Sequence, residues 1–163
     1  MKIVIDENVL LRSVTYKDPQ GNYDHFAIDL MIEAMDCKHT ICVSSEIEDK
    51  YKAQFEKVKN GVYGQNISNP ADIYTRLKNT TGKIEMIPGN SNSNFQHVPN
   101  ERNIKPDDIP FARLAHHVHS ILVTYDGPLK QAMGTEAKEP RQLIGTQPVE
   151  TNNRRGREMR GGR

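Results

Sequence analysis

Short runs of aliphatic and β-branched residues alternate along the chain with segments whose apolar residues recur every three or four positions. The apolar runs predict buried strands at residues 3–5, 41–43, 84–87 and 121–123, with residues 141–144 as a candidate for the last strand. The segments with helical spacing begin near residues 24, 45, 69, 108 and 127 and end near residues 35, 58, 77, 118 and 133. Strands that alternate with helices in this way pair in parallel.

The same pattern predicts the fold class and the domain organisation. The runs at 3–5 and 121–123 contain only Ile, Val and Leu, as expected for strands that are covered on both faces. We therefore predict a three-layer α/β/α sandwich with a central, mainly parallel sheet over residues 1–150, interrupted by a long polar loop at about 88–107. Residues 151–163 are rich in Arg and Gly and are expected to form a disordered tail.

Composition and charge narrow the functional classes. The 163 residues suit one domain, and no apolar run approaches the ~18 residues of a transmembrane helix, so no membrane association is expected. Asp6 and Glu7 stand where a signal peptide would continue its apolar stretch, which favours a cytoplasmic protein. The net charge of +1 is uneven: residues 154–163 carry five Arg and one Glu, while residues 1–153 carry 17 basic and 20 acidic residues. This asymmetry indicates an anionic partner.

Three aspartates are predicted to meet at one edge of the sheet. Asp6 and Asp126 follow the runs at 3–5 and 121–123, and Asp108 begins the helix that leads into the second of these strands. Ligands of open parallel sheets bind beyond the carboxyl ends of the strands, so these side chains converge if the two strands are neighbours. Converging carboxylates stay ionised together only with a compensating cation, and oxygen ligands favour Mg²⁺ or Mn²⁺. Such an ion activates water and binds a phosphate oxygen, which is the chemistry of phosphodiester hydrolysis.

Each of the three aspartates also has a simpler structural explanation. Asp108 is a favoured N-cap residue, and Asp126, which precedes Gly127 and Pro128, is a favoured turn residue. Asp6 can cap a helical turn that follows its strand. Their joint placement favours a shared site over three separate local roles.

The string IVIDENVLL resembles the opening of the PIN-domain nucleases, an apolar strand followed by Asp-x-Asn. The segment DDIPFARLAHHVHSILVTYDGPL is similar to the later signature of this family, in which an Asp precedes an aromatic residue and Leu-Ala, and an apolar strand leads to Thr-x-Asp. Asp6 then matches the first motif acid, Asp108 the third and Asp126 the fourth, within a resemblance that covers residues 1–145. The resemblance implies a PIN-like fold in which these three residues are catalytic and hold Mg²⁺ or Mn²⁺.

The second acid of the family pattern is absent from its usual position. The family carries it in the helix after the second strand, and the matching register places Lys50 there. Glu46 lies one helical turn before Lys50 on the same side of the helix, so it is the best substitute as a fourth catalytic acid. The alternative is that Glu46 only pairs with Lys50 on a solvated helix face.

The cationic end supplies the candidate nucleic-acid contacts, which are Arg154, Arg155, Arg157, Arg160 and Arg163. Arg-rich segments with glycine track nucleic-acid backbones, and a disordered tail that only aids solubility is the alternative. The resemblance implies an endoribonuclease that hydrolyses RNA phosphodiester bonds. An antitoxin or an RNA-processing protein is then the candidate protein partner, and a homodimer is a candidate assembly. The competing hypothesis, which Lys50 favours, is a non-catalytic or weakly catalytic PIN-like module that binds RNA or a protein.

Overall fold

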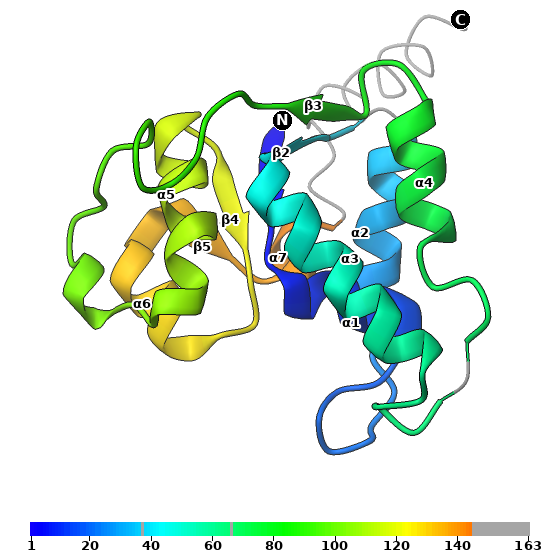
Figure 1. The fold of residues 1–163 in the computed structure, drawn as a ribbon. Coiled ribbons are helices and arrows are strands. Elements are labelled where there is room, and N and C mark those ends of the chain that lie inside the picture. Colours follow the sequence, from blue (N-terminus) through cyan, green and yellow to red (C-terminus); the bar gives the residue numbers. More distant parts are fainter. Residues whose placement is uncertain (37, 66, 145–163) are drawn as a thin grey trace, which may run out of the picture.

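A computed structural model describes residues 1–36, 38–65 and 67–144, and a five-stranded sheet lies at its centre (Figure 1). The strands are β1 (Lys2–Ile5), β2 (Thr40–Val43), β3 (Ile84–Met86), β4 (Ile121–Val123) and β5 (Ala137–Lys138). They lie in the order β3-β2-β1-β4-β5, and every neighbouring pair is parallel. The first strand is therefore central, between β2 and β4. The Arg/Gly tail, which is predicted to be disordered, lies outside the described residues.

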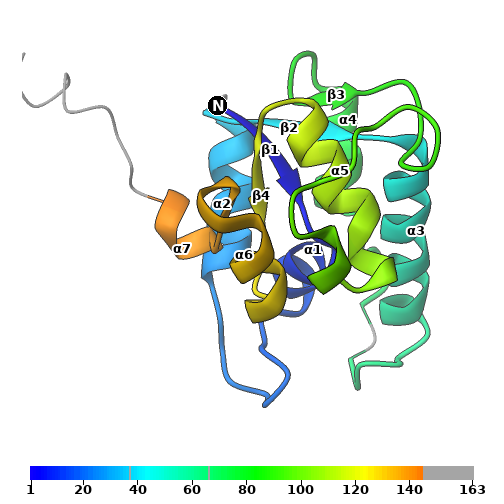
Figure 2. The ribbon, with the colours of Figure 1, turned by 90° about the vertical axis from the view of Figure 1, so that its left-hand side faces the viewer.

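Helices cover both faces of this sheet. They are α1 (Glu7–Thr15), α2 (Phe26–Met35), α3 (Ser45–Lys59), α4 (Asp72–Asn79), α5 (Ile109–His117), α6 (Gly127–Met133) and α7 (Pro140–Leu143). Short 3₁₀ turns add η1 (Glu101–Asn103), η2 (Pro106–Asp108) and η3 (Gly134–Glu136). Figure 2 shows α3 and α5 on one side of the sheet and α2 and α7 on the other. The predicted three-layer α/β/α sandwich with a parallel sheet is confirmed.

The aliphatic composition of the strands follows from this double coverage. Val4 of β1 pairs with Leu122 of β4, and both side chains are fully buried. Above them, the buried rings of Tyr51 in α3 and Phe111 in α5 lie 6.3 Å apart between centroids. Tyr51 also donates its hydroxyl to the carbonyl oxygen of Ile5. This bond fixes α3 to the carboxyl end of the central strand.

Two helices differ from the sequence prediction. The pattern does not predict α1, which begins directly after Asp6 and buries Val9 and Leu10. A helix this short shows too few repeats of the helical period for its pattern to stand out. The pattern also places the start of α4 too early, because this helix begins at Asp72 rather than at Pro70.

The predicted last strand, residues 141–144, is wrong, because α7 takes up most of this segment. Pro140 occupies the first helical position, where its missing N–H leaves no hydrogen bond unmade. The N–H of Glu139 donates to Oε1 of Gln142 at 2.8 Å and forms one half of a capping box. The final strand, β5, has only two residues and ends just before this cap.

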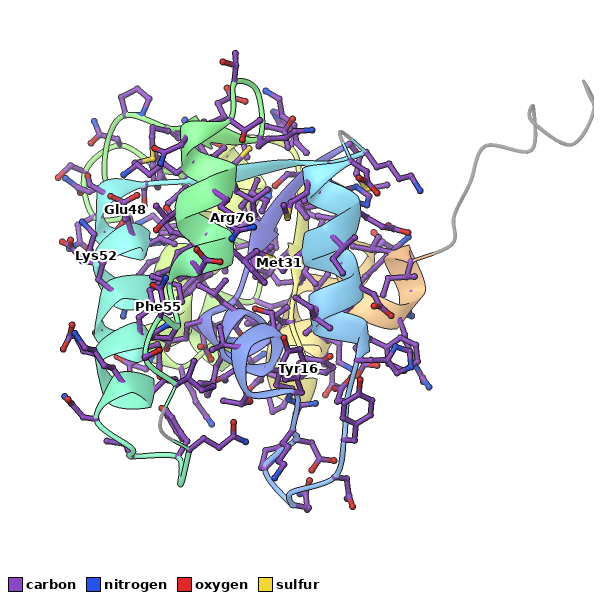
Figure 3. All side chains as sticks on the ribbon, turned by 90° about the vertical axis from the view of Figure 1, so that its right-hand side faces the viewer. Tyr16, Met31, Glu48, Lys52, Phe55 and Arg76 are labelled. Atoms are coloured by element: carbon purple, nitrogen blue, oxygen red, sulfur yellow. The ribbon has the colours of Figure 1, made fainter. Side chains whose placement is uncertain are left out.

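The start of α3 is capped by Ser44, and Glu48 in the first turn has a different role. The Oγ of Ser44 accepts a backbone N–H of the first helical turn at 3.4 Å. Glu48 instead accepts hydrogen bonds from the Tyr74 hydroxyl and from Nζ of Lys78, both at 2.7 Å. Figure 3 shows Glu48 on α3 beside α4, so its carboxylate joins these two helices.

The long polar loop at about 88–107 is anchored to the body of the protein. Three of its apolar side chains are buried: Phe95, Val98 and Ile104. Arg113 of α5 donates from Nε and Nη2 to the two carboxylate oxygens of Glu101, at 2.6 and 2.9 Å. Its Nη1 donates to the carbonyl oxygen of Ser91 at 2.7 Å. These contacts hold the loop against α5.

The Glu101–Arg113 pair is expected to stabilise the fold. Hydrogen bonds to charged groups contribute roughly 1.5–3 kcal/mol, so Glu101→Gln should lower the free energy of unfolding at pH 7 by about 2 kcal/mol. The hydrogen bonds from Arg113 hold the pKa of Glu101 at about 2. The contribution is therefore present at neutral pH and is lost as the pH falls from 4.5, the ordinary value, towards 2.

Urea unfolding of the wild type and of Glu101→Gln at pH 7 and pH 3 measures this effect, and the difference in stability should be smaller at pH 3. Arg102→Gln is the matched control, because Arg102 is exposed in the same 3₁₀ turn. An equal loss of stability in the two variants would contradict the prediction.

Candidate active site

Asp6 stands at the carboxyl end of the central strand and is completely buried. Ile5 lies opposite Val123 in the parallel pairing of β1 with β4, and the N–H of Asp6 donates to the Val123 carbonyl oxygen at 2.9 Å. Thr124 donates its hydroxyl to Oδ2 of Asp6 at 2.7 Å. Oδ1 of Asp6 is buried and has no hydrogen-bond partner among the described residues. This buried oxygen is therefore available to a ligand.

Asp126 follows the end of the neighbouring strand, and Thr124 links it to Asp6. The N–H of Asp126 donates to Oγ1 of Thr124 at 3.0 Å, while the hydroxyl of Thr124 donates to Asp6. Oδ1 of Asp126 accepts the N–H of Leu129 at 2.8 Å and caps α6. One oxygen of Asp126 thus has the local role expected of a turn residue. Within the part of the chain that the structure describes, Oδ2 makes no hydrogen bond.

Asp108 occupies the N-cap position of α5, yet its side chain makes no capping hydrogen bond. A capping role therefore does not account for this residue. Burial raises the pKa of the Asp108 carboxyl, and the negative charges of Asp126 and Glu7 raise it further. The structure thus brings the three predicted aspartates into one electrostatically coupled group.

Within this group, the pKa of Asp6 is raised strongly. Burial raises the pKa of Asp6 to about 7, although the hydrogen bond from Thr124 opposes the rise. The charges of Asp108, Glu7 and Asp126 add to it. A nearby cation would reverse these effects, because it favours the ionised form of every carboxylate around it.

Glu7 is a fourth acid of this group, and the sequence pattern does not single it out. It is half-buried in the first turn of α1, and its charge acts on both Asp6 and Asp108. Nε2 of Gln54 in α3 donates to Oε2 of Glu7 at 3.4 Å. The available signal is position alone: a helix that begins directly after Asp6 keeps the next carboxylate at the same strand end.

The structure does not bring Glu46 together with the three aspartates. Its carboxylate accepts the N–H of Ser91 at 2.7 Å and the hydroxyl of Ser91 at 3.0 Å. Its charge acts on Arg113 and is not among those that shift the pKa of Asp6. Lys50 is half-buried one turn further along α3, and it forms no ion pair with Glu46 or with any other residue of the described ranges. Glu46 thus helps to hold the polar loop.

The donor set fits a hard cation, although the ligands are not gathered in this conformation. Among residues 1–36, 38–65 and 67–144, no group of three or more His, Cys, Asp or Glu side chains is arranged to hold a metal ion. The unpartnered oxygens of Asp6 and Asp126 and the free carboxylate of Asp108 are all of the type that Mg²⁺ and Mn²⁺ prefer. Binding an ion would require these side chains to move closer together.

Comparisons with known proteins leave the motif resemblance without independent support. No protein-family model matches the chain. No curated protein matches its sequence. No helix of the described ranges is long and apolar enough to cross a membrane, and the five arginines of the predicted nucleic-acid-binding tail lie outside those ranges.

The burial of Asp6 predicts how stability depends on pH in metal-free buffer. Its pKa rises from 3.8 to about 7 on folding, so the unfolded chain releases this proton first and the protein loses stability as the pH rises from about 4 to 7. Asp6→Asn should remove this loss. Since each pKa unit corresponds to about 1.4 kcal/mol, the variant should gain up to roughly 4 kcal/mol at pH 8 and little at pH 4.

Urea unfolding in EDTA at both pH values tests this expectation, with Asp107→Asn as the exposed neighbouring control. A less stable Asp6→Asn variant at pH 8 would show that the carboxylate stabilises the fold.

Proposed function

We propose that this protein is a metal-dependent endoribonuclease of PIN type that hydrolyses RNA phosphodiester bonds. The observation that carries the proposal is that Asp6 is buried at the carboxyl end of the central strand with one carboxylate oxygen that has no hydrogen-bond partner in the described structure, while the charges of Asp108 and Asp126 act on it. A fold gains nothing from placing an uncompensated carboxylate there, because burial and like charges both disfavour its ionised form. A bound cation explains the arrangement.

Mg²⁺ or Mn²⁺ would be held by Asp6, Asp108 and Asp126, with Glu7 as the nearest additional acid. When bound, the ion would supply positive charge to a phosphate oxygen and a more acidic water as nucleophile. Thr124 orients the carboxylate of Asp6 through its hydroxyl and fixes the backbone of Asp126 through its oxygen. In both carboxylates one oxygen accepts a hydrogen bond, and the second oxygen, Oδ1 of Asp6 or Oδ2 of Asp126, is free to bind an ion.

RNA as the substrate rests on the PIN resemblance and on charge. The body of the protein, residues 1–153, carries 17 basic and 20 acidic residues, whereas residues 154–163 carry five arginines and one glutamate. Arg binds phosphate bidentately through its guanidinium fork. The tail arginines, Arg154, Arg155, Arg157, Arg160 and Arg163, are therefore proposed to hold the strand.

A second candidate function is an RNA-binding module without nuclease activity. Two observations favour it: the described acids are not gathered around an ion site, and Lys50 stands where the family carries an acid. Such a module would keep the tail and the fold and would bind RNA without cleaving it. The two candidates differ in whether Mn²⁺ binds and supports cleavage.

Asp126→Asn is expected to weaken Mn²⁺ binding by more than about tenfold and to abolish RNA cleavage. Losing even an outer partner of a metal ligand commonly costs 10–100-fold in affinity, and a direct ligand should cost at least that much. Asp49→Asn is the matched control, because it makes the same chemical change at an exposed residue of α3 whose charge does not shift the pKa of Asp6 or Asp108. Calorimetric titration with Mn²⁺ and cleavage of a labelled RNA measure the two effects.

The nuclease proposal fails if the wild-type protein does not bind Mn²⁺, or if Asp126→Asn and the control bind it equally. RNA binding that persists together with an absence of cleavage would support the non-catalytic module.

Glu7 and Glu46 give opposite expectations for the fourth acid. Glu7→Gln should weaken Mn²⁺ binding by several-fold, because the Glu7 charge acts directly on Asp6 and Asp108. Glu46→Gln should leave Mn²⁺ affinity unchanged and lower the free energy of unfolding by about 1 kcal/mol, because it weakens the bonds to Ser91. The same titration and urea unfolding compare the two variants. The reverse result would restore Glu46 as the metal-facing acid.

A further inference from the structure

A cavity of about 500 Å³ lies directly beside the carboxylate group and shares Asp126 with it. One wall comes from α1, a second from the loop that follows it, and a third from the loop that carries Tyr63 and Gln65. Figure 3 shows Tyr16 at the end of α1, where the first of these loops begins. Nε2 of Gln65 donates to the carbonyl oxygen of Thr15 at 3.2 Å, so the two loops are joined at the base of the cavity.

The aromatic walls are held in place by charged and amide groups. The guanidinium of Arg12 lies 3.7 Å from the centroid of the Tyr125 ring and pairs with Asp24 at 3.0 Å. On the opposite side, Tyr63 donates its hydroxyl to Oε1 of Gln54 at 2.6 Å. Gln54 is the residue that contacts Glu7, so one chain of contacts runs from this wall to the acids.

The chemistry of the cavity suits an uncharged planar group. Its volume lies within the range of about 300–1,000 Å³ that is typical of small-molecule sites. Arg12 and Lys17 balance Asp18 and Asp126 in the lining, so the cavity carries no net formal charge. The ring of Tyr63 is 40% exposed and offers a face for stacking.

We propose that this cavity binds a nucleobase of the RNA strand, next to the phosphate that would be held at the carboxylate group. The inference rests on the proposed function for the identity of the strand, whereas the neutral cavity, which is large enough for a base, is a property of the fold alone. Stacking on an aromatic side chain is the usual way in which proteins hold unpaired bases. Asn8, which follows Glu7 in sequence, lines the cavity, and its amide provides polar groups for the base edge.

A phosphate group is a poor occupant of the same cavity. Two acids, Asp18 and Asp126, lie in its lining, and Arg12 already pairs with Asp24, so the exposed Lys17 is the one lining cation without an ion pair among the described residues. Inorganic phosphate in metal-free buffer should therefore not bind there, and this separates base recognition from general attraction of anions.

The test is a chemical-shift titration of the full chain in EDTA with single nucleosides and with inorganic phosphate. Nucleosides at up to about 10 mM, a concentration that reveals millimolar binding, should shift the signals of residues around the cavity. Tyr63→Ala should weaken nucleoside binding by about fivefold or more, because the stacking face is lost. Tyr63→Phe keeps the ring and loses only the hydroxyl, so it should bind within about twofold of the wild type.

Tyr23→Ala is the matched control, because Tyr23 is 73% exposed and does not line the cavity. Equal affinities of Tyr63→Ala and Tyr23→Ala would overturn the proposal, as would the absence of nucleoside-dependent shifts. Nucleoside binding in a protein that shows no Mn²⁺ binding would leave the cavity proposal standing while the nuclease proposal fails. Mn²⁺-dependent cleavage without nucleoside binding would support the nuclease proposal and overturn the cavity proposal.

Discussion

The parallel pairing of β1 with β4 is the constraint on which the site depends. The register that sets Ile5 opposite Val123 places Asp6 and Thr124 next to each other, beyond the last paired residues. Because β1 is the central strand, its end is enclosed, and Asp6 is completely buried. A register shift of one residue would move this carboxylate to the other face of the sheet. The fold therefore fixes a buried carboxylate in one place and, among the described residues, gives it one side-chain hydrogen-bond donor, Thr124.

The surrounding elements hold the other groups around that charge without neutralising it. α6 binds one oxygen of Asp126, and the anchored polar loop leads the chain to Asp108 at the start of α5. Neither contact provides a positive charge to the acids. Arg12 pairs with Asp24 and Arg113 pairs with Glu101, while the charge of Lys105 lowers the pKa of Asp108 without overcoming the effect of burial. The fold thus leaves the acids only partly compensated, which is the arrangement expected where an external cation is to bind.

The sequence predicts the layers and three of the acids because both depend on local patterns. The runs at 3–5 and 121–123 are buried on both faces, and an Asp after such a run must lie near the sheet edge. The position of the Glu46 side chain depends instead on a contact with Ser91, which is 45 residues away in sequence, and a local pattern cannot predict such a contact. Likewise, Arg113 holds the polar loop through a contact with Glu101 that is distant in sequence. The cavity also depends on tertiary structure, because it joins α1, two loops and Tyr125.

The three proposed contacts with RNA, at the acids, in the cavity and along the tail, differ in how they depend on charge. An acidic group without a cation repels a phosphate, by about 1 kcal/mol for unit charges 4 Å apart in water and more where water is excluded. A neutral cavity neither adds to this repulsion nor relieves it, so a base can bind there before the ion arrives. The tail arginines act over a longer range, and their attraction is screened by salt beyond about 10 Å at moderate ionic strength. Attraction by the tail, stacking in the cavity and charge compensation by the ion therefore address separate terms in the binding free energy. If the proposed function holds, a chain whose body is acidic would need all three to hold a phosphodiester beside Asp6.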